Sequence, residues 1–166
     1  REREADSLFA VVEKNYQALS EKANQSKITR SVLPDRKVGP VWYLPGGESS
    51  VGLLYKDAHG MYAYAKDKHS GSLSMPFETV LDKFGQSDFW ILSYRGDFNR
   101  AKLLAEFQGY SMLKPCRTGE IYGCKVDSIP YFEEVSWRPD WLLSDLIQLF
   151  HPDLHIAPMR YYHKLK

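Results

Sequence analysis

The stretch RPDWLLSDLIQLFHPDLHIAPMRYYHKLK, residues 138–166, carries the strongest structural signal in the sequence. Pro139 suits the first turn of a helix, because its missing N–H would have had no partner there. The apolar side chains that follow at three- and four-residue steps are Trp141, Leu142, Leu146, Leu149 and Phe150. This spacing predicts a helix with one apolar face, which Pro152 then ends. Such a helix followed by an aromatic tail is typical of the end of a folded domain.

Upstream of this stretch, segments with strand patterns alternate with segments with helix patterns. Strands are predicted at Arg30–Leu33, Val41–Leu44, Met61–Ala65 and Asp88–Ser93, and a two-stranded ribbon at Met112–Cys116 and Ile121–Val126. Helices are predicted at Glu48–Lys56, Pro76–Phe84 and Phe98–Phe107, the last with Asp97 as its N-cap. The alternation predicts a three-layer α/β/α lobe with a mostly parallel central sheet.

The first residues predict a helix without a start signal. Its apolar stripe consists of Leu8, Val11, Val12, Tyr16 and Leu19. No Ser, Thr, Asp or Asn cap precedes the opening RERE, and two arginines in a first turn oppose the helix dipole. We therefore expect a helix cut in its middle; the alternative is a genuine N-terminus that frays. A linker is expected at Ala23–Lys27.

Length and composition fit a single lobe. A chain of 166 residues can bury a substantial core. The net charge of +1 argues against binding to nucleic acid or to a membrane surface through bulk charge. No run of eighteen apolar residues occurs, so no membrane insertion is predicted.

The sequence favours neither a metal held by the protein nor an enzyme. Cys116 and Cys124 flank a predicted hairpin turn in a register that does not favour a disulfide. His151 and His155 do not share a helix face, because Pro152 lies between them. Nucleophile-elbow, phosphate-loop and dinucleotide-binding motifs are missing. We expect no catalytic residue, no metal ligand and no cofactor.

Ligands of such sheets gather at the carboxyl ends of the strands. This rule selects the loops Pro34–Pro40, Pro45–Ser50, Tyr94–Asp97 and Asp127–Ser136. The candidate ligand-binding residues in or next to the first three loops are Arg36, Lys37, Trp42, Tyr43, Gly46, Gly47 and Arg95. The arginines and the lysine suit anionic oxygens, and free N–H groups after the two glycines would do the same. A plain turn at the glycines and a surface pairing of Arg95 with Asp97 remain alternatives.

Five segments in register resemble one family of proteins. They are RSVLPDRKVGPVWYLPGG at 30–47, DAHG at 57–60, SMPFETVL at 74–81, SDFWIL at 87–92 and the RPD, HPDL and RYYHKL strings at the end. Together they resemble the second, C-terminal lobe of the helical-backbone (class III) periplasmic binding proteins. Members of this family serve ABC importers of ferric siderophores, haem and cobalamin.

The resemblance implies a division of the chain and a function. Residues 1–26 would be the C-terminal part of the helix between two lobes, and 27–166 the C-terminal lobe, with the N-terminal lobe missing. The protein would capture a ferric siderophore or related metal chelate in the cleft between the lobes and deliver it to the transmembrane permease. It would be periplasmic or extracytoplasmic, with a lipid anchor of the full-length protein as one option. Glu133 and Trp137 would stand at the cleft rim, and Glu78 would dock on the permease.

Other functions remain open at this stage. A corrinoid or haem would suit Trp42, Tyr43 and Trp137 as well as a siderophore would. Glu133 and its aromatic neighbours would alternatively pack against the terminal helix. A chelatase or nitrogenase-like lobe is a competing class, although the spacing of Cys116 and Cys124 does not suit a cluster. A domain that only mediates protein interactions is the third option.

Overall fold

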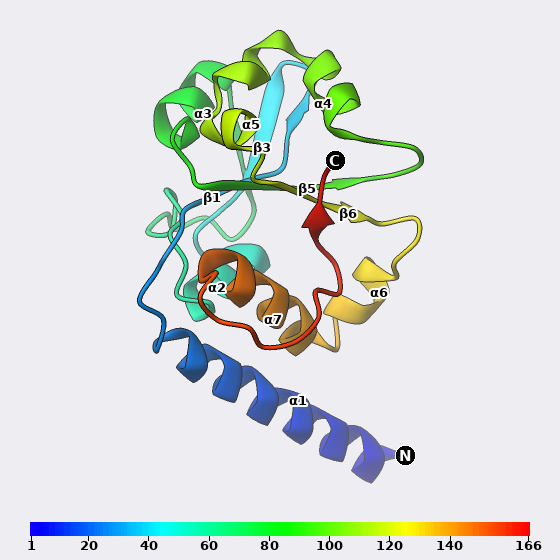
Figure 1. The fold of residues 1–166 in the computed structure, drawn as a ribbon. Helices are drawn as coiled ribbons and strands as arrows, with labels where there is room; N and C mark the ends of the chain where they lie inside the picture. Colours follow the sequence, from blue (N-terminus) through cyan, green and yellow to red (C-terminus); the bar gives the residue numbers. More distant parts are fainter.

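A four-stranded sheet forms the centre of the computed structural model, which describes all 166 residues. The strands β1 (Val32–Pro34), β5 (Phe89–Tyr94) and β6 (Ile121–Lys125) run parallel, and the short β7 (His163–Lys164) returns antiparallel along β6. Helices cover both faces of this sheet (Figure 1). The predicted three-layer α/β/α lobe with a mostly parallel sheet is confirmed.

The helices divide between the two faces. One face carries α2 (Ser50–Asp57) and α7 (Pro139–Phe150), with α6 (Tyr131–Val135) beside α7. The opposite face carries α3 (Phe77–Phe84), α4 (Arg100–Glu106), the 3₁₀ turn η1 (Gln108–Met112) and α5 (Lys114–Thr118). A small antiparallel sheet in the order β2-β3-β4 adjoins this second layer. Its strands are β2 (Lys37–Val38), β3 (Val41–Pro45) and β4 (Ser72–Met75).

The helix α7 begins at Pro139 and ends before Pro152, as its sequence predicts. It is buried on more than one face, because Leu143 and Ile147 are buried together with Leu142, Leu146, Leu149 and Phe150 of the predicted stripe. The reason is visible in Figure 1: α7 lies between the sheet and the long helix α1 (Glu2–Ala23). A helix enclosed by two neighbours needs apolar residues all round.

The apolar stripe of α1 is only partly covered. Val12 is buried, and Tyr16 and Leu19 pack against the core. Leu8 and Val11, nearer the N-terminus, remain 37% and 53% exposed. None of the helices is both long and apolar enough to cross a membrane.

A buried carboxylate joins α7 to the tail of the chain. Asp145 on α7 accepts the backbone N–H groups of Arg160, Tyr161 and Tyr162 at 3.0, 2.7 and 3.1 Å. Burial raises the pKa of Asp145, and these three bonds oppose the rise. This contact fixes the start of the RYYHKL string to α7. From this point the tail runs antiparallel along β6.

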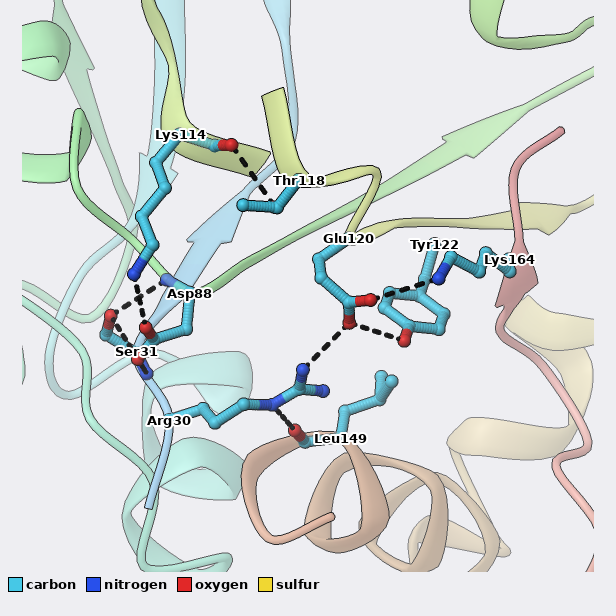
Figure 2. A network of polar contacts seen from close by, with 9 residues as sticks. All are labelled: Arg30, Ser31, Asp88, Lys114, Thr118, Glu120, Tyr122, Leu149 and Lys164. Carbon is cyan, nitrogen blue, oxygen red and sulfur yellow. Dashed lines mark hydrogen bonds and ion pairs between the residues drawn. The ribbon is translucent and has the colours of Figure 1, made fainter. Parts of the chain in front are cut away.

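A polar network closes the amino end of the sheet (Figure 2). Glu120, just before β6, accepts hydrogen bonds from Arg30, Tyr122 and Lys164 at 2.8, 2.8 and 3.0 Å. Arg30 also donates to the carbonyl of Leu149 at the end of α7. The network therefore joins the linker after α1, two strands and α7 at the edge of the sheet opposite to the carboxyl ends of its parallel strands.

A second group of polar contacts lies beside it in Figure 2. Asp88, just before β5, accepts from the backbone N–H of Ser31 at 2.8 Å and from Lys114 Nζ at 3.0 Å. These bonds fix the start of β5 to the start of β1 and to α5. The parallel register of the two strands is thereby held at its first residues.

The predicted strand at Met61–Ala65 is wrong. Only Met61 forms an isolated bridge, with Ser31, and the following residues form a turn. The alternating pattern came from Tyr62 and Tyr64, whose rings both pack on Phe84, with centroids 5.8 and 5.7 Å away. Side chains two residues apart share one side in this turn as they would in a strand.

The predicted ribbon is wrong in its first half. Residues 114–118 form α5, with Pro115 in the first turn and Gly119 ending the helix at φ 78°. The strand β6 pairs instead with β5, in parallel. Cys116 and Cys124 are both buried free thiols.

The predicted cap of α4 is also wrong. Asn99 caps the helix by accepting the N–H of Lys102 at 2.9 Å. Asp97 lies two residues earlier and pairs with the Lys102 ammonium at 2.6 Å. Asp97 thus contacts the first turn of α4 through the side chain of Lys102, whereas a cap would accept a backbone N–H.

Candidate functional site

A hollow of about 620 Å³ lies where β1 and β5 end, against the turn between β3 and α2. We call it the main hollow. Its polar lining consists of Asp35, Arg36, Tyr43, Ser49, Ser50, Ser70, Ser72 and Ser93. Its apolar lining includes Val38, Leu44, Val51 and Leu92. The parallel strands β1 and β5 direct their ends to one edge, and the hollow forms there.

A second, more enclosed hollow of about 240 Å³ adjoins the main hollow. We call it the aromatic pocket. The side chains that give it its character are Tyr55 from α2, Tyr131 and Phe132 from α6, and Tyr162 from the tail. Asp35, Pro45, Val51, Leu92 and Ser93 line both hollows. The two hollows therefore form one continuous cleft.

Asp35 stands at the junction of the two hollows. It follows β1 directly and has φ 66°, a left-handed conformation that aspartate tolerates better than most residues. Its backbone N–H donates to Ile91, and its backbone carbonyl accepts the indole N–H of Trp90. Its carboxylate has no hydrogen bond or ion pair. The residue keeps an exposed surface toward the open cleft, yet the protein around it raises the pKa of the carboxyl to about 6 through burial.

Of the two predicted cationic residues after β1, only Arg36 lines the main hollow. Its guanidinium lies 3.4 Å from Glu106 Oε1 and stacks over the ring of Phe98 at 4.6 Å. Lys37 turns away, with its Nζ 3.6 Å from the centre of the Phe107 ring. Both cations thus lie against groups of the α4 and η1 region, although Arg36 Nη1 has no hydrogen-bond partner there.

Trp42 and Tyr43 have opposite orientations on β3. Trp42 has no exposed surface; its indole N–H donates to the carbonyl of Pro34 at 2.9 Å. Its ring packs against Trp90 and Tyr110, with centroids 5.7 and 5.8 Å away. The expected ligand contact of Trp42 is therefore corrected to a place in the core. Tyr43 is 46% exposed and lines the main hollow.

Gly46 and Gly47 make a close backbone approach. A Cβ on Gly46 would lie 2.2 Å from the carbonyl oxygen of His69, and one on Gly47 2.2 Å from that of Asp67. Their N–H groups donate to Gly71 and to the Asp67 side chain. The N–H groups of the two glycines are therefore not free for a ligand. The prediction concerned the N–H groups that follow them at the helix start, and it stays a prediction. The glycines instead dock the 67–71 loop that forms one wall of the main hollow.

The other three predicted ligand-binding residues lie outside both hollows. Arg95 is exposed on the loop after β5, without an ion pair; Asp97, its expected partner, pairs with Lys102. Glu133 is exposed on α6, next to the residues of that helix that line the aromatic pocket. Trp137 is 54% exposed and lines a separate groove of about 560 Å³ between α1 and the start of α7.

Glu78 lies in the first turn of α3 and is exposed, as its place off the apolar stripe predicts. The stripe itself faces the core, with Val80 and Phe84 buried and Phe77 and Leu81 packed against the core cluster. Glu78 makes no ion pair with another side chain. It is therefore accessible to a partner.

Sequence reasoning missed Asp35 and the tyrosines beside it. Asp35 is the first residue after a strand that ends in the cleft, and the carboxyl-end rule already selected its loop. Tyr55 is near the end of a predicted helix, and Tyr162 is in the tail, so no local pattern brings them together. No group of three or more His, Cys, Asp or Glu side chains is placed to hold a metal ion.

The sequence and the structure were compared with those of known proteins. No known family profile and no curated protein matches the sequence. Solved structures do match. The periplasmic heme-binding protein RhuT from Roseiflexus sp. RS-1 has a TM-score of 0.66 at 19% identity, over 89% of this chain and 55% of that chain.

Two further solved structures have a similar fold. A structure from Saccharomonospora viridis DSM 43017, described as an ABC-type Fe3+-hydroxamate transport system, has a TM-score of 0.65 at 18% identity, over 87% of this chain and 48% of that chain. The TroA-like periplasmic binding protein FepB from Veillonella parvula has a TM-score of 0.61 at 16% identity, over 91% and 47%. This chain thus spans about half the length of these neighbours. It has the fold of one lobe of the TroA-like periplasmic binding proteins.

Proposed function

We propose that this chain is the C-terminal lobe of an extracytoplasmic solute-binding protein that captures a metal chelate and delivers it to an ABC importer. The observation that carries the proposal is the open cleft at the carboxyl ends of β1 and β5, in a fold shared with siderophore- and heme-binding proteins. A hollow of about 620 Å³ with many hydroxyl groups and a few apolar side chains suits a compact polar ligand. The wall on the other side of the ligand would come from the missing N-terminal lobe.

The geometry of the cleft gives little support to a catalytic role. Burial raises the pKa of Cys116 to about 11 and that of Cys124 to about 12, so neither thiol is activated for nucleophilic or cluster-ligating work. Ser93 and the other serines of the main hollow have no histidine among the lining residues. We propose a binding protein without enzymatic activity.

The proposal predicts that metal chelates bind weakly at the cleft, because only one wall is present. Diamagnetic probes make this measurable by NMR: gallium(III) complexes of a hydroxamate and a catecholate siderophore, gallium protoporphyrin, and cyanocobalamin. At least one probe should shift the backbone amides of Asp35, Tyr43 and Ser93 in the ¹⁵N-labelled chain. Ser93→Trp, which fills the junction of the two hollows, should abolish the shifts.

The outcome against the proposal is equally concrete. If none of the four probes perturbs amides around the cleft at millimolar concentration, the chain is not a chelate-binding wall. Shifts confined to the groove at Trp137 would place the ligand elsewhere.

We further propose that Glu78 docks on the permease. The expected result is that Glu78→Arg leaves chelate binding unchanged but lowers chelate uptake by the producing cells at least tenfold, as charge reversal at a docking contact does. Glu21→Arg provides the matched control, because Glu21 is exposed and belongs to α1. The helices α1 and α3 lie on opposite sides of the central sheet (Figure 1). Normal uptake with Glu78→Arg would remove Glu78 from the docking surface.

A further inference from the structure

The aromatic pocket has one formal charge. Among its lining residues only Asp35 is ionised at neutral pH, and no cationic side chain lines the pocket. Burial raises the pKa of the phenols of Tyr55 and Tyr162 far above the usual range and that of Tyr131 to about 12. These hydroxyls stay protonated and neutral. The pocket is therefore a compact apolar space with neutral hydroxyl groups and a single carboxylate.

Asp35 and Tyr55 are two polar residues of this pocket whose side chains make no hydrogen bond within the chain. Tyr55 is only 3% exposed, yet its hydroxyl makes no hydrogen bond and lies at the wall of the pocket. The Asp35 carboxylate also makes no hydrogen bond or ion pair. Both groups line the hollow, so each is open to a hydrogen bond with a group that arrives with the ligand.

The nearby cations do not neutralise Asp35. Arg36 is the neighbour in the chain, but it lines the main hollow and not the aromatic pocket. Its guanidinium lies against Glu106 and Phe98, and its Nη1 has no hydrogen-bond partner. Lys37 stacks on Phe107. An anion that entered the aromatic pocket would meet a carboxylate and no counter-charge.

We propose that the aromatic pocket binds a compact, largely apolar group that carries a neutral or cationic hydrogen-bond donor, with Asp35 as its acceptor and Tyr55 as a second polar contact. This inference rests on the proposed function and specifies the ligand class: chelates with an ammonium, amide or hydroxyl arm are preferred over chelates that present only anionic oxygens. The expected ligand charge therefore differs from the one that the sequence predicts, because Arg36, Lys37 and Arg95 favour an anionic siderophore.

Two hydroxamate chelates that differ mainly in one charge test the proposal. The gallium(III) complex of desferrioxamine B has a free ammonium arm, whereas the ring-closed complex of desferrioxamine E is neutral. In ¹⁵N-amide titrations of the chain, the first should bind about tenfold more tightly, the difference expected for one hydrogen bond between charged groups. The largest shifts should be at Asp35, Val126 and Tyr131.

The variants localise the effect. Asp35→Asn should remove the preference for the ammonium arm, and the fold should be kept because asparagine tolerates the left-handed backbone at this position. Asp97→Asn removes one acidic charge from a neighbouring exposed loop and should leave the preference unchanged. Tyr55→Phe keeps the ring and should weaken both complexes by a few-fold.

The outcomes separate the two proposals. Equal affinity for the two complexes, a preference that survives Asp35→Asn, or tighter binding of a gallium tris-catecholate would overturn the donor preference while chelate binding itself stands. Failure of every chelate to perturb the cleft would instead remove the proposed function. If the Asp35→Asn variant does not fold, its amide spectrum will show this directly. The affinities of the two gallium complexes for the wild-type chain then still test the donor preference.

Discussion

Replacing Trp42 with alanine is expected to lower the free energy of unfolding by about 3–5 kcal/mol, the range for a large aromatic residue in a core. The side chain has no exposed surface and packs between Trp90 and Tyr110. The substitution leaves a cavity and also removes the donor to the carbonyl of Pro34. Urea unfolding at neutral pH, followed by far-UV circular dichroism, measures the loss.

Tyr43→Ala is the matched control, because Tyr43 is the next residue on the same strand and is 46% exposed. It should cost less than about 1 kcal/mol, as exposed substitutions usually do. Where Trp42→Ala is too unstable to study, Trp42→Phe should show a smaller loss in the same direction. Wild-type stability of Trp42→Ala combined with lost chelate binding would return Trp42 to the ligand site.

Acid should weaken the fold through Glu120. Burial alone would raise the pKa of this carboxyl, but the hydrogen bonds from Arg30, Tyr122 and Lys164 outweigh it and lower the pKa to about 2, from an ordinary value of 4.5. A carboxyl whose pKa is lower in the folded state stabilises the fold above its unfolded pKa. This contribution is therefore complete above about pH 5 and is lost as the pH falls from about 4.5 toward 2.

The contribution is on the order of 2–3 kcal/mol, reduced from the full shift because the Glu120 side chain is 26% exposed. Glu120→Gln should remove it at pH 7, and the difference from wild type should shrink as the pH falls below 4. Urea titrations at pH 7, 5, 4 and 3 test this. Glu48→Gln, whose partner Lys68 is 3.8 Å away at an exposed site, should have little effect at any pH. A constant difference across the series would show that Glu120 acts through packing and not through its charge.

Local patterns predicted the elements whose signals are contained within one segment. The spacing of apolar residues in 139–150 and in 77–84 predicted α7 and α3 almost to the residue. The apolar centre of 88–93 predicted β5. In each of these segments the apolar spacing and the end signals lie within the segment itself, so they are sufficient to place the element.

The site depended far more on distant contacts. The alternation on β3 shows that Trp42 and Tyr43 point to opposite sides, but not which side is the core. The position of η1, whose Tyr110 packs on Trp42, decides that. Likewise Met61–Ala65 alternates as a strand would, and only the packing of Tyr62 and Tyr64 on Phe84 shows a turn.

The sequence by itself determined the fold class, the order of most strands and helices, and the resemblance to one lobe of a periplasmic binding protein. Only the tertiary structure decided which charges are free to meet a ligand. Arg36 pairs with Glu106 and stacks on Phe98 without a hydrogen bond from its Nη1, and Lys37 stacks on Phe107. Asp35 has no ion pair and no side-chain hydrogen bond at the junction of the hollows. The physical reason is that a side chain's availability depends on the groups within a few ångströms of it, and here those groups come from segments about seventy residues away in the chain.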